Sequence, residues 1–174
     1  MLKLSGLDYK ILFELMKNSK ISDRKLAKKI GVSQPTVTRR RARLEREGVL
    51  EYTAIPNFEK LGLGIIAFSF TKWNPEFYQV SKEEFARKTA EYVKKRPNLI
   101  LVSSGRGLGM TRMSMSIHTD YADLVKFTKD AKTEWGPYVG EIESFIISVG
   151  ADRFLRKLTF KHLPEYLKNM AKVG

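Results

Sequence analysis

Arginine, threonine and glutamine are concentrated in one short stretch, "SQPTVTRRRARLERE" at positions 33–47. Such side chains donate the hydrogen bonds that contact nucleic-acid bases and phosphates. At 100° per residue, one face of a helix over this stretch would carry Pro35, Thr36, Arg39 and Arg43. Val37 and Leu44 would share the opposite face. We therefore expect Val37 and Leu44 to be buried and the arginine-bearing face to be exposed.

The exposed face of this helix predicts contacts with double-stranded DNA. Arg39 and Arg43 can enter a major groove, where arginine reads guanine through two hydrogen bonds. Gln34 and Thr38 flank that face and suit adenine or phosphate, and Arg40 at its edge suits phosphate. The candidate DNA-binding residues are Gln34, Pro35, Thr36, Thr38, Arg39, Arg40 and Arg43.

Arg41 points toward the side of the helix that should be buried, about 40° from Val37 at helical spacing. An unpaired buried charge is costly, so we expect its head group to reach outward and pair with Glu45, one turn later. The alternative interpretation is a solvated surface helix whose arginines are balanced by Glu45, Glu47 and Glu51.

The charge balance of the chain agrees with a polyanionic partner. Its 174 residues include 32 Lys and Arg against 19 Asp and Glu, a formal charge of +13. Nucleic acid fits this excess; an anionic membrane surface, or lysines that are merely solvated, are the alternatives. Without cysteine and with only His118 and His162, we expect no metal and no cofactor. No signal peptide or long apolar run is visible, so we expect a cytoplasmic protein without a membrane partner.

Residues 1–60 are predicted to form a winged helix-turn-helix domain. Helical periodicity begins at "LDYKILFELMKN" and resumes at "SDRKLAKKIG", with Ser22 as N-cap and Gly31 as the stop. Ser33 then caps the arginine-rich helix, which should end near Gly48. "VLEYTAI" at 49–55 is β-rich and suits a short strand or wing.

Residues 61–150 are predicted to form a ferredoxin-like βαββαβ domain, which makes the whole chain an α+β protein. Strand-like segments alternate with two helical ones, in the order 64–72, 81–97, 99–104, 110–118, 119–135 and 141–149. The glycines of "GRGLG" (105–109) are more typical of a tight hairpin than of a phosphate-binding loop, which should open a helix. Residues 151–174 would be a basic tail that contacts DNA or stabilises a dimer.

The chain resembles the Lrp/AsnC (feast/famine) transcription regulators. The matching positions are Leu7-Asp8, Ile11-Leu12, Ile21-Ser22, Leu26-Ala27, Gly31-Val32-Ser33, Val37, Arg39-Arg40, Arg43-Leu44-Glu45, Gly48-Val49-Leu50 and "EKLGLG" at 59–64. The resemblance implies a C-terminal regulatory (RAM-like) domain and a homodimer built through the regulatory sheets, which can assemble further into an octamer. It also implies palindrome-like DNA sites and small effectors, often amino acids.

Two positions depart from the family pattern. Arg41 stands where such proteins usually have an aliphatic residue, and "SGRGLGMTR" (104–112) replaces a hairpin that usually carries acidic residues. In the family that hairpin helps to form the effector pocket, so the candidate effector-binding residues are Ser104, Gly105, Arg106, Gly107 and Arg112. Without the acidic partner for an ammonium group, either the effector differs from an amino acid, as an anionic metabolite would, or there is none.

We therefore expect a sequence-specific DNA-binding transcriptional regulator rather than an enzyme. One alternative is an enzyme similar to the sirohaem decarboxylases, in which His118, Arg106 and Arg112 would line a pocket for a tetrapyrrole. Another is a ligand-sensing or partner-binding module that does not read DNA. Visible absorbance would identify the first alternative. A gel shift with the promoter of its own gene, with and without competitor, would separate the second alternative from a DNA-binding regulator.

Overall fold

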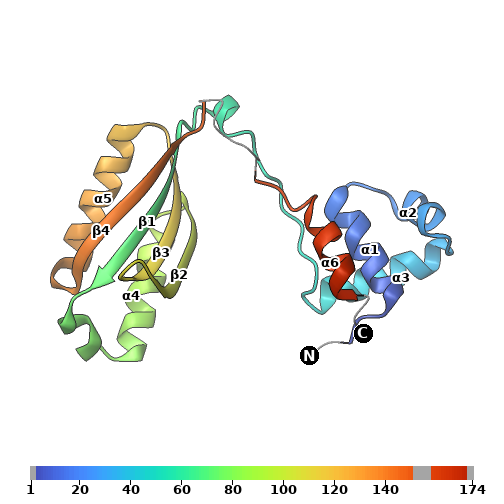
Figure 1. Ribbon diagram of the computed structural model, residues 1–174, viewed down its shortest axis with the longest axis horizontal. Coiled ribbons are helices and arrows are strands. Elements are labelled where there is room, and N and C mark those ends of the chain that lie inside the picture. Colours follow the sequence, from blue (N-terminus) through green and yellow to red (C-terminus); the bar gives the residue numbers. More distant parts are fainter. Residues whose placement is uncertain (1–2, 151–157, 172–174) are drawn as a thin grey trace. The chain divides into compact units, whose positions relative to one another are not determined.

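The computed structural model describes residues 3–150 and 158–171, which form two compact units. The first unit combines residues 1–55 with 156–174, and the second comprises 56–155 (Figure 1). Within the described part of the chain, no helix is both long enough and apolar enough to cross a lipid bilayer.

The first unit is built on three helices that the sequence predicts. They are α1 (Gly6–Lys17), α2 (Asp23–Ile30) and α3 (Gln34–Arg46). The expected caps are present, since the hydroxyls of Ser22 and Ser33 accept hydrogen bonds from backbone amides in the first turns of α2 and α3. Gly31, with φ of 75°, ends α2 in the left-handed conformation that favours glycine. The three helices enclose a core of Ile11, Leu15, Leu26, Ala27, Val37 and Leu44.

The C-terminal segment adds a further helix to this unit. Helix α6 (Leu163–Ala171) contacts α1, and Pro164 at its start is fully buried. Lys17 Nζ on α1 lies 3.6 Å from Glu165 Oε1 on α6. Residues 151–157 and 172–174, which belong to the expected basic tail, lie outside the described residues. The described end of the chain therefore completes the first unit.

The predicted wing strand is not present. Residues 50–57 form neither helix nor strand, and Tyr52 and Ile55 are 39% and 45% exposed. A strand is stable only beside a partner that accepts its hydrogen bonds, and no described strand of the first unit is available to pair with this segment. The residues of "VLEYTAI" favour a strand by their side chains, but the segment lacks the pairing that a strand requires.

The second unit has the predicted βαββαβ order. Its elements are β1 (Ile65–Trp73), α4 (Lys82–Lys94), β2 (Leu99–Gly107), β3 (Met110–His118), α5 (Tyr121–Trp135) and β4 (Val139–Ser148). The strands form one antiparallel sheet in the order β2-β3-β1-β4. Leu108 and Gly109, with φ of 53° and 72°, form the tight turn between β2 and β3, as the glycine pattern predicts. Short 3-10 helices lie at Glu59–Leu61, Pro75–Gln79 and Gly136–Tyr138.

Helices α4 and α5 cover one face of this sheet (Figure 1). Polar residues alternate onto the covered face, so that Arg112, Ser116 and His118 of β3 are buried. The alternate positions place Met113 and Met115 on the other face, where Phe145 of β4 is 66% exposed. The covered face of the sheet thus carries polar side chains and the open face carries apolar ones. This is the reverse of a sheet whose outer face meets water.

Candidate nucleic-acid interface

Helix α3 presents the predicted face to solvent. Val37 and Leu44 are 0% exposed, which confirms the two predicted anchors. The face away from the core carries the candidate DNA-binding residues. Of these, Gln34, Pro35, Thr38 and Arg39 are exposed, and Thr36, Arg40 and Arg43 are half-buried. Ser33 caps the helix through the Thr36 amide at 3.4 Å, so the face begins at a defined first turn.

Arg39 is the arginine of the "RRR" run that has no partner among the described residues. Among the residues that the structure describes, none forms an ion pair or a side-chain hydrogen bond with Arg39, and its side chain is exposed. Its five N–H donors are therefore available to an external acceptor. This placement agrees with the predicted contact with a base edge.

Arg40 has a different partner from the one expected. Its Nη1 atom lies 2.9 Å from Asp8 Oδ1 and donates to Ser5 Oγ at 2.8 Å, which ties α3 to the first turn of α1. The side chain of Asp8 is only 1% exposed. In the structure, Arg40 thus neutralises a buried carboxylate of its own unit instead of standing free for a phosphate. Ser5 and Asp8 also form the capping box of α1.

The pKa of Asp8 lies below its usual value. Burial raises this pKa. Hydrogen bonds from the hydroxyl and the backbone amide of Ser5, together with the guanidinium of Arg40, lower it by more than burial raises it. Asp8 is therefore a carboxylate at neutral pH, which preserves its ion pair with Arg40.

Arg41 behaves as the helical geometry predicts. Its Nε atom lies 3.1 Å from Glu45 Oε1, which confirms the expected pair one turn later. Its Nη1 atom also lies 3.0 Å from Asp23 Oδ1, and Thr38 Oγ1 donates to Asp23 Oδ2 at 2.7 Å. Asp23 thus links α2 to α3 across the turn. Arg41 and Thr38 both contribute to holding α3 in place.

Arg43 lies between the free and the fully engaged arginines. Its Nε atom is 3.1 Å from Glu47 Oε1, in a pair whose side chains are 35% and 28% exposed. A helical pair of this kind contributes only about 0.3–0.5 kcal/mol. Arg43 also reaches α1 and the residues before it, since Nη1 lies 4.0 Å from Asp8 Oδ2 and Nη2 donates to Lys3 O at 3.5 Å. A phosphate or a base edge can therefore replace Glu47 at small cost, whereas the two longer contacts would have to be given up as well.

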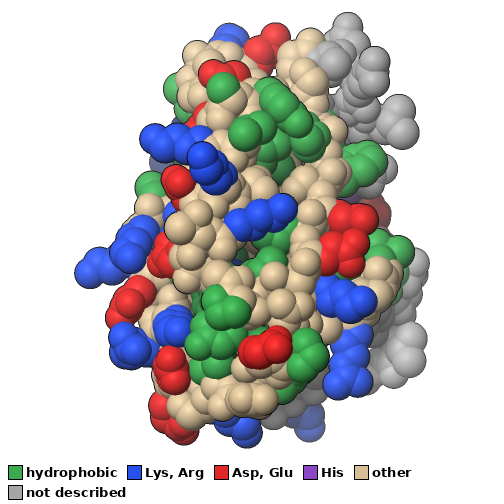
Figure 2. All heavy atoms as spheres, turned by 90° about the vertical axis from the view of Figure 1, so that its left-hand side faces the viewer, with side chains coloured by type: hydrophobic (Ala, Val, Ile, Leu, Met, Phe, Trp, Pro, Cys, Tyr) green, Lys and Arg blue, Asp and Glu red, His purple; other side chains and the backbone are tan. Residues whose placement is uncertain are grey.

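The excess of positive charge lies mainly outside the second unit. Residues 1–55 carry thirteen Lys and Arg against six Asp and Glu, whereas residues 56–150 carry thirteen against eleven. Figure 2, which faces the second unit, shows basic, acidic and hydrophobic side chains interspersed over its surface. The segment that contains α3 therefore has the electrostatic character expected of a surface that binds a polyanion.

The five candidate effector residues do not line one cavity. Ser104 lies opposite Arg112 in the ladder between β2 and β3, but Ser104, Gly105, Arg106 and Gly107 are exposed, whereas Arg112 is buried under the helices. Of the five, only Arg112 lines the described cavity between the sheet and helices α4 and α5. The register between β2 and β3 places these residues at one end of the sheet, but their side chains do not line a common site.

His118, a candidate pocket residue of the enzyme alternative, is fully buried. Its Nε2 lies 2.8 Å from Ser116 Oγ, and its Nδ1 lies 3.1 Å from Asp123 Oδ2 in the first turn of α5. The imidazole is thus held by two side chains of its own unit. Arg106, Arg112 and His118 do not meet in a shared cavity within the described residues, as a tetrapyrrole pocket would require.

Sequence reasoning missed Ser5, Asp8 and Asp23, which hold α3 through its side chains. One signal was present, because Ser5 and Asp8 have the Ser-x-x-acid spacing of a capping box. The ion pairs from α3 to α1 and α2 join residues 18 to 32 positions apart, and no local pattern predicts such pairs.

Comparison with known proteins agrees with this geometry. The pattern of the winged helix-turn-helix DNA-binding family matches residues 4–51. An uncharacterized HTH-type transcriptional regulator of Pyrococcus furiosus is 36% identical over 97 residues, which cover 55% of this chain and 61% of that protein. The leucine-responsive regulatory protein of Rhizobium meliloti is 33% identical over 91 residues, which cover 52% and 58% of the two chains. The chain thus spans about three fifths of the length of these curated relatives.

The fold itself is shared over nearly the whole chain. The crystal structure of a transcriptional regulator from Neisseria meningitidis, in complex with L-Met, has a TM-score of 0.73 at 22% identity and covers 92% of this chain and 99% of that one. The two units together define a helix-turn-helix protein with a βαββαβ regulatory fold. In sequence and in fold, this chain is thus similar to regulators of the Lrp/AsnC type.

Proposed function

We propose that this protein is a sequence-specific DNA-binding transcriptional regulator whose recognition helix is α3. The observation that carries the proposal is the position of Arg39. It lies on the exposed face of α3, free of described partners, while Arg40 and Arg41 fasten the helix to its unit. A rigidly held helix with a free arginine fits a major groove, where arginine reads guanine. A regulator of transcription would act on the chromosome, which agrees with the cytoplasmic location expected from the sequence.

The DNA-binding surface of this proposal comprises Gln34, Pro35, Thr36, Thr38, Arg39 and Arg43. Arg39 and Arg43 would contact base edges, and Gln34 and Thr38 would flank them. Phosphate neutralisation by other basic residues of the first unit would supply affinity without sequence preference. Arg40 is left out because its guanidinium is bound to Asp8.

A homodimer would be formed through the open face of the sheet. Phe68 of β1 lies opposite both Met115 of β3 and Phe145 of β4, which creates an apolar strip on the face away from the helices. Burial of such a strip favours association of two copies. A homodimer would place two α3 helices in successive major grooves, about 34 Å apart. We also propose that such dimers assemble into an octamer, as the resemblance to the Lrp/AsnC regulators implies.

A small-molecule effector, either an amino acid or an anionic metabolite, would modulate DNA binding. The structure of the Neisseria meningitidis relative is described as a complex with L-Met, which supports ligand control in this family. In this chain, however, the exposed hairpin residues and the buried Arg112 do not share a cavity.

Selection of binding sites from random duplex DNA at a defined salt concentration tests the regulator proposal. We expect enriched sequences with two related half-sites whose centres lie about one helical turn apart. Affinity should fall linearly with the logarithm of salt concentration. Recovery of no enriched sequence, with equal affinity for every duplex, would refute sequence-specific regulation and favour the module that does not read DNA.

A further inference from the structure

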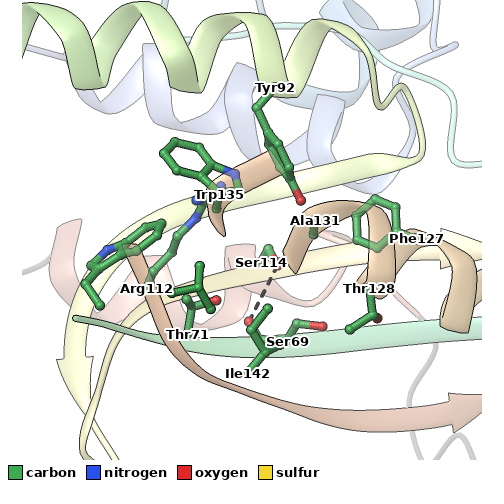
Figure 3. Close-up of a pocket in the computed structure, with 12 residues that line it drawn as sticks. Ser69, Thr71, Tyr92, Arg112, Ser114, Phe127, Thr128, Ala131, Trp135 and Ile142 are labelled. Atoms are coloured by element: carbon green, nitrogen blue, oxygen red, sulfur yellow. Dashed lines mark hydrogen bonds between the residues drawn. The ribbon is translucent and has the colours of Figure 1, made fainter. Parts of the chain in front are cut away.

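A small cavity lies inside the second unit, between the sheet and helices α4 and α5 (Figure 3). Its volume is about 30 Å³. The sheet side contributes the hydroxyl-bearing residues Ser69, Thr71 and Ser114, because the polar face of the strands is turned toward the helices. Polar side chains at this position in a core call for a polar occupant.

Arg112 is the cation of this cavity. Its side chain is 8% exposed, and its Cζ atom lies 5.4 Å from the ring centres of Trp73 and Tyr92 and 5.5 Å from that of Trp135. Figure 3 shows Arg112 beside Trp135, with Tyr92 on the helix side of the cavity. The π faces of the three rings offset part of the cost of burying a charge, but they accept no strong hydrogen bond in the plane of the guanidinium.

No described residue supplies a negative charge to Arg112. It forms no ion pair and donates no side-chain hydrogen bond within the described residues, and none of the twelve described lining residues is Asp or Glu. Burial lowers the pKa of Arg112, and no carboxylate counteracts this effect. Arginine nevertheless stays protonated in proteins, so the cavity holds an uncompensated positive charge.

Trp135 adds a second donor without an acceptor. Its side chain is 5% exposed, and its Nε1 atom has no hydrogen-bond partner among the described residues. Buried indole N–H groups usually have a partner. Trp135 and Arg112 line the same cavity, and both can only donate.

We propose that this cavity is a binding site for a small monovalent anion, of which the carboxylate group of a one- or two-carbon acid is the best fit. Arg112 would pair with the anion and Trp135 Nε1 would donate a hydrogen bond to it. Ser69 Oγ lies 2.8 Å from Ser144 Oγ, and Ser114 Oγ donates to Ser69 O at 3.5 Å. These hydroxyls would have to leave those partners to donate to the anion, and hydroxyls can rotate in this way. The flat aromatic walls suit a planar carboxylate.

The cavity volume limits the size of the ligand. A single water needs roughly 10–15 Å³ of such space, so about 30 Å³ accommodates two or three groups of that size. Formate, acetate, nitrate and chloride are within this range. Larger anions, such as bulky sulfonates, exceed it and provide the control salt.

The two tryptophans of the chain, Trp73 and Trp135, both line the cavity and therefore report on it directly. The test is a titration of the full-length protein with sodium acetate, at ionic strength held constant with a bulky sulfonate salt, followed by tryptophan fluorescence. We expect a saturable change and a rise in the melting temperature that the sulfonate alone does not give. A linear, unsaturable response with no thermal shift would overturn the proposal.

Matched variants assign the response to the site. Arg112→Gln should weaken acetate binding at least tenfold, because it removes the charged donor, whereas Arg106→Gln on the exposed hairpin should change it less than twofold. Trp135→Phe keeps an aromatic ring, leaves Trp73 as reporter and should weaken binding severalfold. Equal titrations for the wild type and for Arg112→Gln would overturn the proposal. If Arg112→Gln does not fold, unchanged binding by Trp135→Phe would overturn it in the same way.

Parallel titrations with formate, nitrate and chloride distinguish organic from inorganic anions. Tighter binding of formate and acetate than of chloride assigns the site to carboxylates, and chloride binding tighter than both would overturn that assignment. This inference deepens the effector part of the proposed function, but its test contains no DNA. Failure of the titration therefore leaves the DNA-binding proposal standing, and failure of DNA binding does not alter the titration.

Discussion

Arg40 and Asp8 form an ion pair that joins the recognition helix to the first helix of the chain, with 2.9 Å between Nη1 and Oδ1. The carboxylate is 1% exposed and the guanidinium side chain is 26% exposed. Such a pair fixes orientation more than it adds stability, because desolvation offsets much of the Coulomb attraction. Loss of one partner is nevertheless costly, since it leaves the other charge poorly compensated.

The first prediction concerns the variant Asp8→Asn. We expect it to lower the free energy of unfolding of the first unit by roughly 2–3 kcal/mol, somewhat below the value for breaking a fully buried pair, because Arg40 is partly exposed. Urea unfolding followed by far-ultraviolet circular dichroism measures this effect. Tryptophan fluorescence reports only the second unit, since both tryptophans lie there, and its transition should not move.

The matched control is Glu91→Gln, which breaks an exposed i,i+4 pair with Arg87 on α4. Exposed pairs contribute little, so this variant should stay within about 0.5 kcal/mol of the wild type. Equal effects of the two variants would mean that the Asp8–Arg40 pair has no special role in holding α3.

The second prediction is a pH dependence of the same pair. Because the pKa of Asp8 in the folded protein lies below its ordinary value of 3.8, the carboxylate stabilises the fold above that value. The contribution is lost as the pH falls through the lowered pKa. The difference in melting temperature between the wild type and Asp8→Asn should therefore be largest near pH 7 and shrink below about pH 4. A difference that stays constant down to about pH 2.5 would exclude the ionised Asp8 as its cause.

Helical periodicity predicted most of the fold, because the same spacing that makes a helix amphipathic also decides which residues it buries. Val37 and Leu44 were identified as anchors in this way, and the outward reach of Arg41 to Glu45 followed from the same geometry. The strand expected over "VLEYTAI" is absent, since pairing depends on a partner strand that this segment does not encode.

The candidate sites were less predictable because they depend on contacts distant in sequence. The position of Arg40 at the edge of α3 indicated a phosphate contact, yet Asp8, 32 residues earlier, binds it. Arg112 was grouped with its hairpin neighbours, but strand alternation turns its side chain toward Trp73 and Trp135. The alternation of side chains was visible in "MTRMSMSIH". The sequence did not indicate that the polar side of this strand would be the buried one.

The third prediction is that Arg39→Ala relaxes sequence preference. If Arg39 reads one base, its loss should cost about 1–3 kcal/mol on the preferred duplex and much less on duplexes altered at that base pair. Competition binding at fixed salt, with duplexes varied one pair at a time, measures this difference. Equal losses on all duplexes would mean that Arg39 contacts the backbone instead.

Arg87→Ala provides the matched control for this charge change, because Arg87 is an exposed arginine on α4 of the second unit. It should leave both the affinity and the base preference unchanged. Arg40→Ala should act mainly through stability, with a lower melting temperature and no loss of preference in the fraction that stays folded.

The fourth prediction tests the open face of the sheet as the surface that forms the homodimer. Phe145→Asp places a charge on the apolar strip that includes Phe68 and Met115, and should weaken dimerisation about a hundredfold. Light scattering coupled to size exclusion, over a dilution series, measures the shift to monomer. Tyr121→Asp is the control, since Tyr121 on α5 is 62% exposed against 66% for Phe145 but lies off the strip. Equal dissociation of both variants would point to general destabilisation, whereas a Phe145→Asp protein that stays dimeric would place the contact on another surface.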